Sequence, residues 1–143
     1  MKTLSLRQVR ELPAGGRYAY VEVPEFGTTF DEKTGAETAP YRVRVVPLTV
    51  QANAALNHYI YEAEIDDAGK TRLRLSSTHQ RSTVMAALCA YDDEGNLVFG
   101  ENYADAVSRV ESLPARYSPA IVRIAAAALE LAGAATVEDA QKN

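Results

Sequence analysis

The sequence has few of the residues from which metal sites and disulfides are built. Its 143 residues include no tryptophan, one cysteine and two histidines. With so few ligands the chain cannot assemble a zinc site of the usual spacing. Cys89 has no partner for an internal disulfide and lies in the most apolar run of the sequence. We therefore interpret it as a small buried side chain in a reducing compartment.

An excess of positive charge and a long apolar run are also missing. The 15 Lys and Arg residues are outnumbered by 19 Asp and Glu residues, and the net charge is −4, which argues against a nucleic-acid-binding protein. No run approaches the roughly 18 apolar residues of a membrane span, and the residues after Met1 do not form the apolar core of a signal peptide. We expect a cytosolic protein that binds neither nucleic acid nor membrane.

Catalytic motifs are not recognisable in the sequence. Neither His58 nor His79 lies near a nucleophile elbow or a similar motif. The glycines at 15 and 16 lack the following Lys-Ser/Thr of a phosphate-binding loop. The acidic clusters at 66–67 and 92–94 lack the ligand spacing of a calcium loop and are typical of hairpin turns. We therefore expect a protein that is not an enzyme, with no catalytic residue, no cofactor and no metal.

The most informative stretch is Thr83 to Phe99. Nine uncharged residues are followed by an acidic turn that contains Gly95, and then by a short apolar run. We interpret the stretch as a β-hairpin over about 83–99 whose first strand is covered on both faces. A buried helix over about 77–90 is the alternative, because alanine, leucine and methionine favour helices and periodicity cannot separate the two in so short a run.

Alternation predicts two strands in the N-terminal part. Residues 18–23 alternate up to Pro24, and residues 41–46 alternate with Val43 and Val45 on one face. Between them, residues 28–40 are polar and have little to bury, so we expect an exposed, mobile loop.

The middle of the chain permits two interpretations. Thr49 is a suitable N-cap, and apolar residues at three- and four-residue spacings predict a helix over about 50–64. However, residues 59–65 and 71–75 both alternate, and residues 66–69 are typical of a turn. In the resulting hairpin, which would follow a shorter helix, glutamates 62 and 64 would face arginines 72 and 74 across the strands.

Two helices are predicted near the C-terminus, over about 103–112 after Asn102 and over about 119–132 after Ser118, the second ending at Gly133. A short polar tail over 134–143 follows. The apolar arc of the last helix spans about half its circumference, which is more than a small domain needs to cover. Either this helix is central to the core, or part of it meets another chain, which is the alternative on which the functional hypothesis depends. The candidate protein-interaction residues are Ile121, Val122, Ile124, Leu129 and Leu131.

Together these elements predict a single α+β domain over residues 1–143, with N-terminal strands, a hairpin, a middle helix and two C-terminal helices. Four segments, in this order, also resemble the tail assembly chaperones of long-tailed, siphovirus-type bacteriophages. They are Val21 to Gly27, Tyr41 to Thr49, Arg81 to Phe99 with its Asp-Asp-Glu-Gly-Asn-Leu-Val-Phe, and Leu113 to Asn143. Two features depart from the family pattern: the loop over 28–40 is longer, and the segment after Thr49 is less charged.

This resemblance implies a non-enzymatic role. Such chaperones are made in the cytoplasm of the infected cell, coat the long helical tape-measure protein, keep it soluble and help to recruit subunits of the tail tube. They are then absent from the mature virion. The implied partners are the tape-measure protein and the major tail tube protein. The strongly apolar last helix is the candidate surface for the tape-measure protein or, alternatively, for self-association into a homo-oligomer. The alternative is a structural virion protein, a tail-completion or connector subunit, that stays in the particle.

Overall fold

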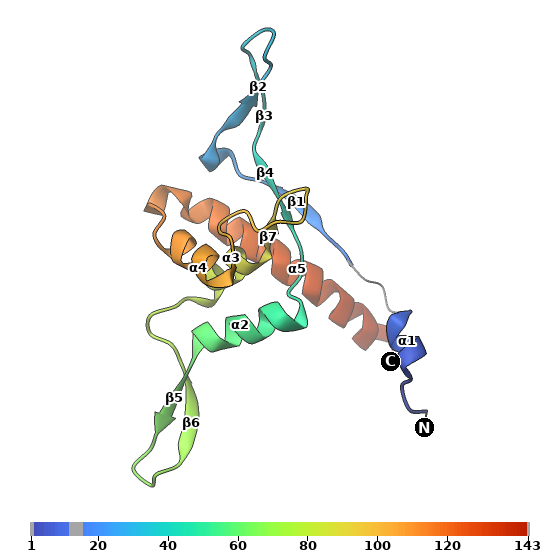
Figure 1. Cartoon of the computed structure of the whole chain (residues 1–143), viewed down its shortest axis with the longest axis vertical. Coiled ribbons are helices and arrows are strands. Elements are labelled where there is room, and N and C mark those ends of the chain that lie inside the picture. The colour runs from blue at the N-terminus through green and yellow to red at the C-terminus, as the bar shows by residue number, and fades with distance from the viewer. Residues whose placement is uncertain (1, 12–15, 143) are drawn as a thin grey trace.

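A computed structural model describes residues 2–11 and 16–142, with the backbone alone for residues 134–142. The fold is α+β (Figure 1). In chain order, its elements are α1 (Leu6–Arg10), β1 (Ala19–Glu22), the 3-10 turn η1 (Pro24–Phe26), β2 (Thr28–Phe30), β3 (Glu37–Pro40), β4 (Arg42–Val45), α2 (Val50–Ile60), β5 (Tyr61–Ile65), β6 (Thr71–Leu75), α3 (Arg81–Cys89), β7 (Ala90–Tyr91), α4 (Tyr103–Glu111), η2 (Ala115–Tyr117) and α5 (Ser118–Lys142).

Helix α3 forms the centre of the core. Its residues from Val84 to Cys89 are all buried, and α2, α4 and α5 pack around it. The predicted hairpin over 83–99 is therefore wrong in its first strand, and the alternative of a buried helix is right. A run that is apolar on every side suits a helix covered on every side, and its alanines let the neighbouring helices approach closely.

The second half of the predicted hairpin is present as a short remnant. Strand β7 is two residues long, and a turn follows in which the Asp92 N–H donates to the Asn96 carbonyl at 2.8 Å. Gly95 takes a φ of 87°, which only glycine adopts without strain. Leu97 then bridges back to Tyr91. The acidic cluster at 92–94 thus forms a turn, as predicted.

The main sheet is antiparallel in the order β1-β4-β7. Val21, Val43 and Val45 are buried on its inner face, which lies against α5. On the outer face Arg42 lies over the Tyr20 ring at 3.7 Å from its centroid. The alternation predicted for both strands is confirmed.

The segment over 28–40 is exposed but is not a loop. Strands β2 and β3 pair as a hairpin with an irregular register between Thr29 and Phe30. Backbone pairing satisfies the polar groups there, so the segment needs little apolar burial of its own to form strands. Figure 1 shows this hairpin projecting from the body of the molecule.

Helix α2 begins as predicted, with the Thr49 hydroxyl accepting the Ala52 N–H at 3.0 Å. It ends at Ile60 rather than at 64, because the chain continues directly into β5 and the hairpin β5–β6. The Asp66 carboxylate fixes the turn by accepting the N–H groups of Ala68 and Lys70 at 3.0 and 2.9 Å. The interpretation as a shorter helix and a hairpin is therefore the right one.

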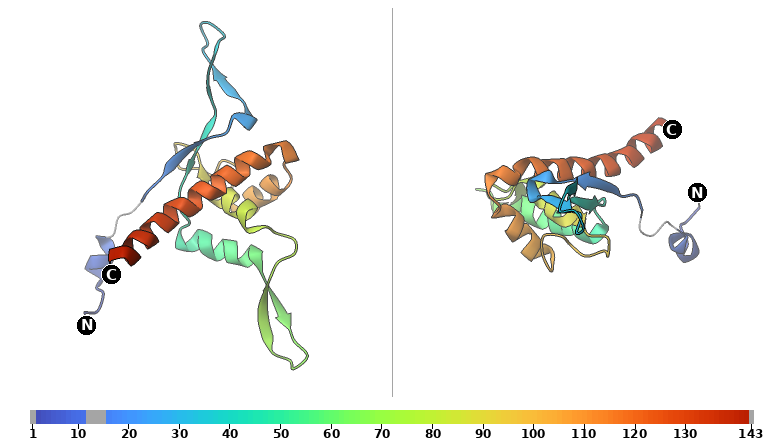
Figure 2. Two further views of the ribbon diagram at one scale, coloured as in Figure 1. Left: turned by 180° about the vertical axis from the view of Figure 1, so that it is seen from behind. Right: turned by 90° about the horizontal axis from the view of Figure 1, so that it is seen from above.

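Helix α4 is capped by Asn102 as predicted, but α5 is much longer than expected. It continues through Gly133 to Lys142, so the predicted end at Gly133 is wrong. One glycine costs a helix about 1 kcal/mol relative to alanine, and the alanines around Gly133 are the best helix formers. Figure 2 shows the C-terminal part of α5 extending beyond the body of the molecule.

Candidate protein-interaction surface

The hairpin β5–β6, which we call the arm, has one apolar face that the described part of the chain leaves exposed. The pairs Tyr61–Leu75, Ala63–Leu73 and Ile65–Thr71 place alternate side chains on one side of the arm. Ile65, Leu73 and Leu75 are 73%, 69% and 70% exposed. We call Tyr61, Ala63, Ile65, Leu73 and Leu75 the arm face.

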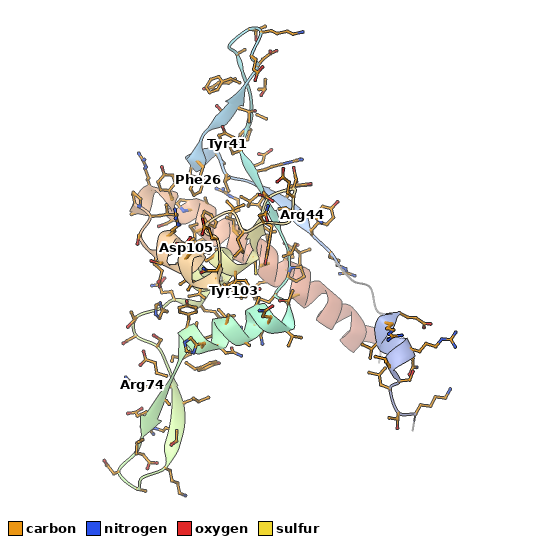
Figure 3. All side chains as sticks on the ribbon, viewed as in Figure 1. Phe26, Tyr41, Arg44, Arg74, Tyr103 and Asp105 are labelled. Atoms are coloured by element: carbon orange, nitrogen blue, oxygen red, sulfur yellow. The ribbon has the colours of Figure 1, made fainter. Side chains whose placement is uncertain are left out.

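The charged side chains of the two strands lie on the opposite side of the arm and are paired within the hairpin, and the turn between the strands carries Asp66, Asp67 and Lys70. Arg74 lies 3.1 Å from Glu62, and Arg72 lies 3.6 Å from Glu64, as the sequence predicted. Such cross-strand pairs are worth about 0.2–1 kcal/mol each, toward the lower end when exposed. Figure 3 shows Arg74 on the arm, away from the helical core. Charge is thus kept off the arm face.

The base of the arm is fixed by a cluster of hydrogen bonds around Ser76. Its N–H donates to the Ile60 carbonyl at 2.7 Å, and its hydroxyl donates to Glu62 at 3.0 Å. The same hydroxyl accepts the N–H groups of Thr78 and His79 at 3.1 and 3.2 Å. His79 Nδ1 in turn lies 2.6 Å from Glu111 Oε2, at the end of α4. These contacts hold the arm in a defined position on the core.

The five candidate residues on α5 fall into three groups. Ile124 is fully buried in the core and cannot contact another chain, so including it in an interaction surface was wrong, whereas Ile121 is mostly buried but lines a hollow beside Val122. Leu131 is partly buried against the core. Val122 and Leu129 are 59% and 54% exposed. The apolar arc of α5 is therefore wider than its own chain covers, on the side of Val122 and Leu129.

That side of α5 forms a regular stripe. Val122, Ala126, Leu129 and Gly133 are all exposed and follow one another at spacings of four, three and four residues. This is the spacing at which side chains meet a facing helix in a coiled coil. We call these four residues the α5 stripe.

The stripe borders a row of hollows over the start of α3. The largest, about 660 Å³, lies between the base of the arm and α5 and is lined by Leu75, Met85 and Leu129 among others. A hollow of about 260 Å³ shares Met85 and Leu129 with it, and another of about 200 Å³ beside Val122 shares Gln80 and Ser82. We call this row the α5 groove. It joins the arm face to the α5 stripe.

On another side of α5, Arg123 forms hydrogen bonds to the N-terminal part of the chain. The Arg123 guanidinium donates to Glu25 Oε1 at 2.8 Å and to the Glu22 carbonyl at 2.9 Å. The hydrogen bond from Arg123 lowers the pKa of Glu25, and the same bond raises the pKa of Arg123. Arg123 thus ties η1 and β1 to α5.

Comparison with known proteins found no relative of this chain. No family model, no curated protein and no solved structure matches the chain. Among the described residues, no helix is both long and apolar enough to cross a membrane. Within the same residues, no group of three His, Cys, Asp or Glu side chains is placed to hold a metal ion. The exposed apolar surface and the sequence resemblance are therefore the features that indicate a function.

Sequence reasoning missed the arm face. Ile65, Leu73 and Leu75 carry the most exposed apolar side chains of this surface, yet they were not among the candidates. The signal was present, because both strands of the arm alternate and place every charge on one side. The opposite side of such a hairpin is apolar, and a two-stranded hairpin cannot bury it alone.

Proposed function

We propose that the protein is a non-enzymatic tail assembly chaperone of a long-tailed bacteriophage. It binds the tape-measure protein through the α5 groove, keeps it soluble and helps to recruit subunits of the tail tube. It acts in the cytoplasm of the infected cell and leaves before the virion is complete. The observation that carries the proposal is the exposed α5 stripe beside the α5 groove, and the sequence resemblance supplies the identity of the partner.

A stripe of this kind suits an amphipathic helix. Ala126 and Gly133 have almost no side chain and allow the backbone of a partner helix to approach closely. Val122 and Leu129 provide two protruding apolar contacts, seven residues apart on one line of α5. A tape-measure protein of the kind implied by the resemblance is a long helix, and helix-in-groove recognition is a common way to cover an apolar stripe.

The modest area of the stripe is compatible with release. Fully burying a valine or leucine side chain is worth about 1.5–3 kcal/mol, and nearly half of each side chain is already covered. Val122 and Leu129 would each add about 1 kcal/mol to binding. Many weak contacts along a long partner give firm binding, yet each chaperone molecule can still dissociate.

Co-expression with the tape-measure protein of the same phage tests the proposal. The wild-type chain should keep it soluble and copurify with it, whereas Leu129→Asp should reduce copurification at least tenfold while the far-UV circular dichroism stays native. Val50→Asp is the matched control, because Val50 is 91% exposed and lies at the start of α2, outside the lining of the groove. If Leu129→Asp and Val50→Asp copurify equally well, the α5 groove is not the binding site.

Mass spectrometry of purified virions separates the chaperone from a structural virion protein. A chaperone is present in lysates of infected cells and absent from purified particles. If the chain is found in particles at a fixed copy number, the proposal fails and the tail-completion or connector subunit takes its place.

A further inference from the structure

The main sheet has one edge that the described part of the chain covers and one that it leaves open. Beside β7, the Val98 N–H donates to the Ala90 carbonyl at 3.0 Å and Leu97 bridges to Tyr91, so this edge is covered. Strand β1 forms the opposite edge and, among the described residues, pairs with β4 alone. Unpaired N–H and C=O groups along such an edge are a template for another strand. We propose that β1 adds an extended segment of another protein as a further strand of this sheet, with an apolar side chain of that segment in a hollow between β1 and α5.

The alternation of hydrogen bonds along β1 determines which of its backbone groups face outward. The Val23 N–H donates at 2.7 Å to the carbonyl of the residue before β4, so Val23 faces that strand. Every second residue of an antiparallel strand does the same, which assigns Val21 to β4 and directs the backbone groups of Tyr20 and Glu22 away from it. The Arg123 side chain on α5 confirms this direction, because it donates to the Glu22 carbonyl at 2.9 Å. The Tyr20 N–H, the Tyr20 carbonyl and the Glu22 N–H are left without a partner among the described residues, and they match the backbone of an extended strand.

The hollow between β1 and α5 gives an added strand a place to bury a side chain. It has a volume of about 250 Å³ and is lined by Ala19 of β1 and by Ala127 and Leu131 of α5, together with Arg17 and Glu130. Its lining includes β1 but not β4, so the hollow lies beside the open edge of β1. Alternate residues of an added strand point to the same face of the sheet as Ala19, and a cavity of about 150 Å³ holds a benzene ring. The hollow therefore accommodates one leucine-sized side chain of the segment.

The two hairpins also have open edges, but their surroundings suit an added strand less. The hairpin β2–β3 and the arm project from the body of the molecule (Figure 1), so a strand added to either would bury few of its side chains. At β1, helix α5 packs against the sheet and supplies Ala127 and Leu131 beside its edge (Figure 2). A helix cannot replace the strand, because its own N–H and C=O groups are bonded internally and cannot satisfy those of Tyr20 and Glu22. The site is therefore specific for extended backbone, and the inference does not depend on the proposed function.

Amide hydrogen exchange, followed by NMR of the full chain, tests whether the edge is open. The N–H groups of Tyr20 and Glu22 should exchange at least tenfold faster than those of Val21 and Val23, which are bonded toward β4. If all four exchange equally slowly at every protein concentration, the chain itself covers the edge and the proposal fails. Protection of Tyr20 and Glu22 that increases with protein concentration would assign the edge to a second copy and overturn the proposal as well.

A synthetic peptide with alternating threonine and leucine between terminal lysines is the probe for the added strand. At millimolar concentration it should slow the exchange of the Tyr20 and Glu22 N–H groups at least tenfold. The control is a peptide with the same side chains but N-methylated amides, which carries the same apolar groups and cannot donate hydrogen bonds to β1. We expect the control to give no protection. Equal protection by the two peptides, or none by either, would contradict strand addition.

Substitutions in the chain separate the contribution of the backbone from that of the side chains. Tyr20→Pro removes the outward N–H, and proline is tolerated at such a position of an edge strand. Tyr20→Ala loses the same ring but keeps the N–H, so Tyr20→Pro should bind the peptide at least tenfold more weakly than this matched control. Ala127→Leu should weaken binding by filling the hollow, whereas Ala126→Leu, on the exposed α5 stripe, should not. Equal affinities within either pair overturn the proposal. Because Tyr20→Pro leaves the α5 stripe intact, copurification of the tape-measure protein with this variant tests the proposed function separately.

Discussion

Truncation of Ile124 and of Leu129 should have very different effects, although both belong to the apolar arc of α5. Ile124 is fully buried, and truncating such a side chain to alanine costs about 2–5 kcal/mol because the lost contacts leave a cavity. Leu129 is 54% exposed, so Leu129→Ala removes about half of the 1.5–3 kcal/mol of a fully buried leucine and leaves no enclosed cavity. We expect about 1 kcal/mol for Leu129→Ala.

Urea unfolding followed by circular dichroism measures this contrast. With a slope of about 2 kcal/mol per molar urea, Ile124→Ala should lower the midpoint by about 1–2.5 M and Leu129→Ala by about 0.5 M, with unchanged slopes. The comparison identifies the side of α5 that faces the core. Equal shifts for the two variants would show that Leu129 is as much a core residue as Ile124. The reasoning that leads to the α5 stripe would then be refuted.

Three further outcomes follow from individual contacts. Glu25→Gln should lower the free energy of unfolding at pH 7, because Arg123 lowers the pKa of Glu25 and so stabilises the folded state while the carboxylate is charged. This stabilisation is lost as the pH falls below about 4.5 and the carboxylate becomes protonated, so the variant and the wild type should differ less at pH 3 than at pH 7. Unfolding at both pH values measures the difference, and an equal difference at the two contradicts the prediction. Gly100→Ala should cost about 1–3 kcal/mol, since an added Cβ would lie 2.8 Å from the Ala106 Cα; an unchanged urea midpoint would be inconsistent with this packing. The Cys89 thiol should react with a disulfide reagent at least 100-fold more slowly in the native state than in urea, because burial raises its pKa to about 12; similar rates would mean that it is accessible.

Local signals in the sequence predicted much of the fold. The caps at Thr49 and Asn102 and the turn that ends at Gly69 each depend on a few neighbouring residues, and the structure has all three. The pairing of Glu62 with Arg74 was predictable as well, since alternation and the length of the turn define the register of a hairpin.

Helix α3 was not predictable in the same way. An apolar run of nine residues is compatible with a strand covered on two faces and equally with a helix covered on all sides. Only the elements that pack against the run decide between the two. Those neighbours, α2, α4 and α5, come from other parts of the chain on both sides of α3. The end of α5 was missed because the cost of Gly133 was overestimated relative to the alanines around it.

The interaction surface was predictable only in part for a related reason. A helical wheel gives the angle between Val122 and Ile124, but it does not tell which of them faces the core. In the structure α3 and the main sheet pack on the side of Ile124, which leaves Val122 and Leu129 in solvent. The arm face needed one further step, namely the recognition that a hairpin with all its charges on one side is bare on the other.

The two hairpins and the overhanging end of α5 also affect how the molecule moves through solution. An outline with projections experiences more friction than a sphere of equal mass, so even a single copy should diffuse slowly and elute early from a gel-filtration column. An elution volume calibrated with globular standards would then overestimate the number of copies. The exposed area of 10425 Å² thus predicts a raised frictional ratio for the monomer itself.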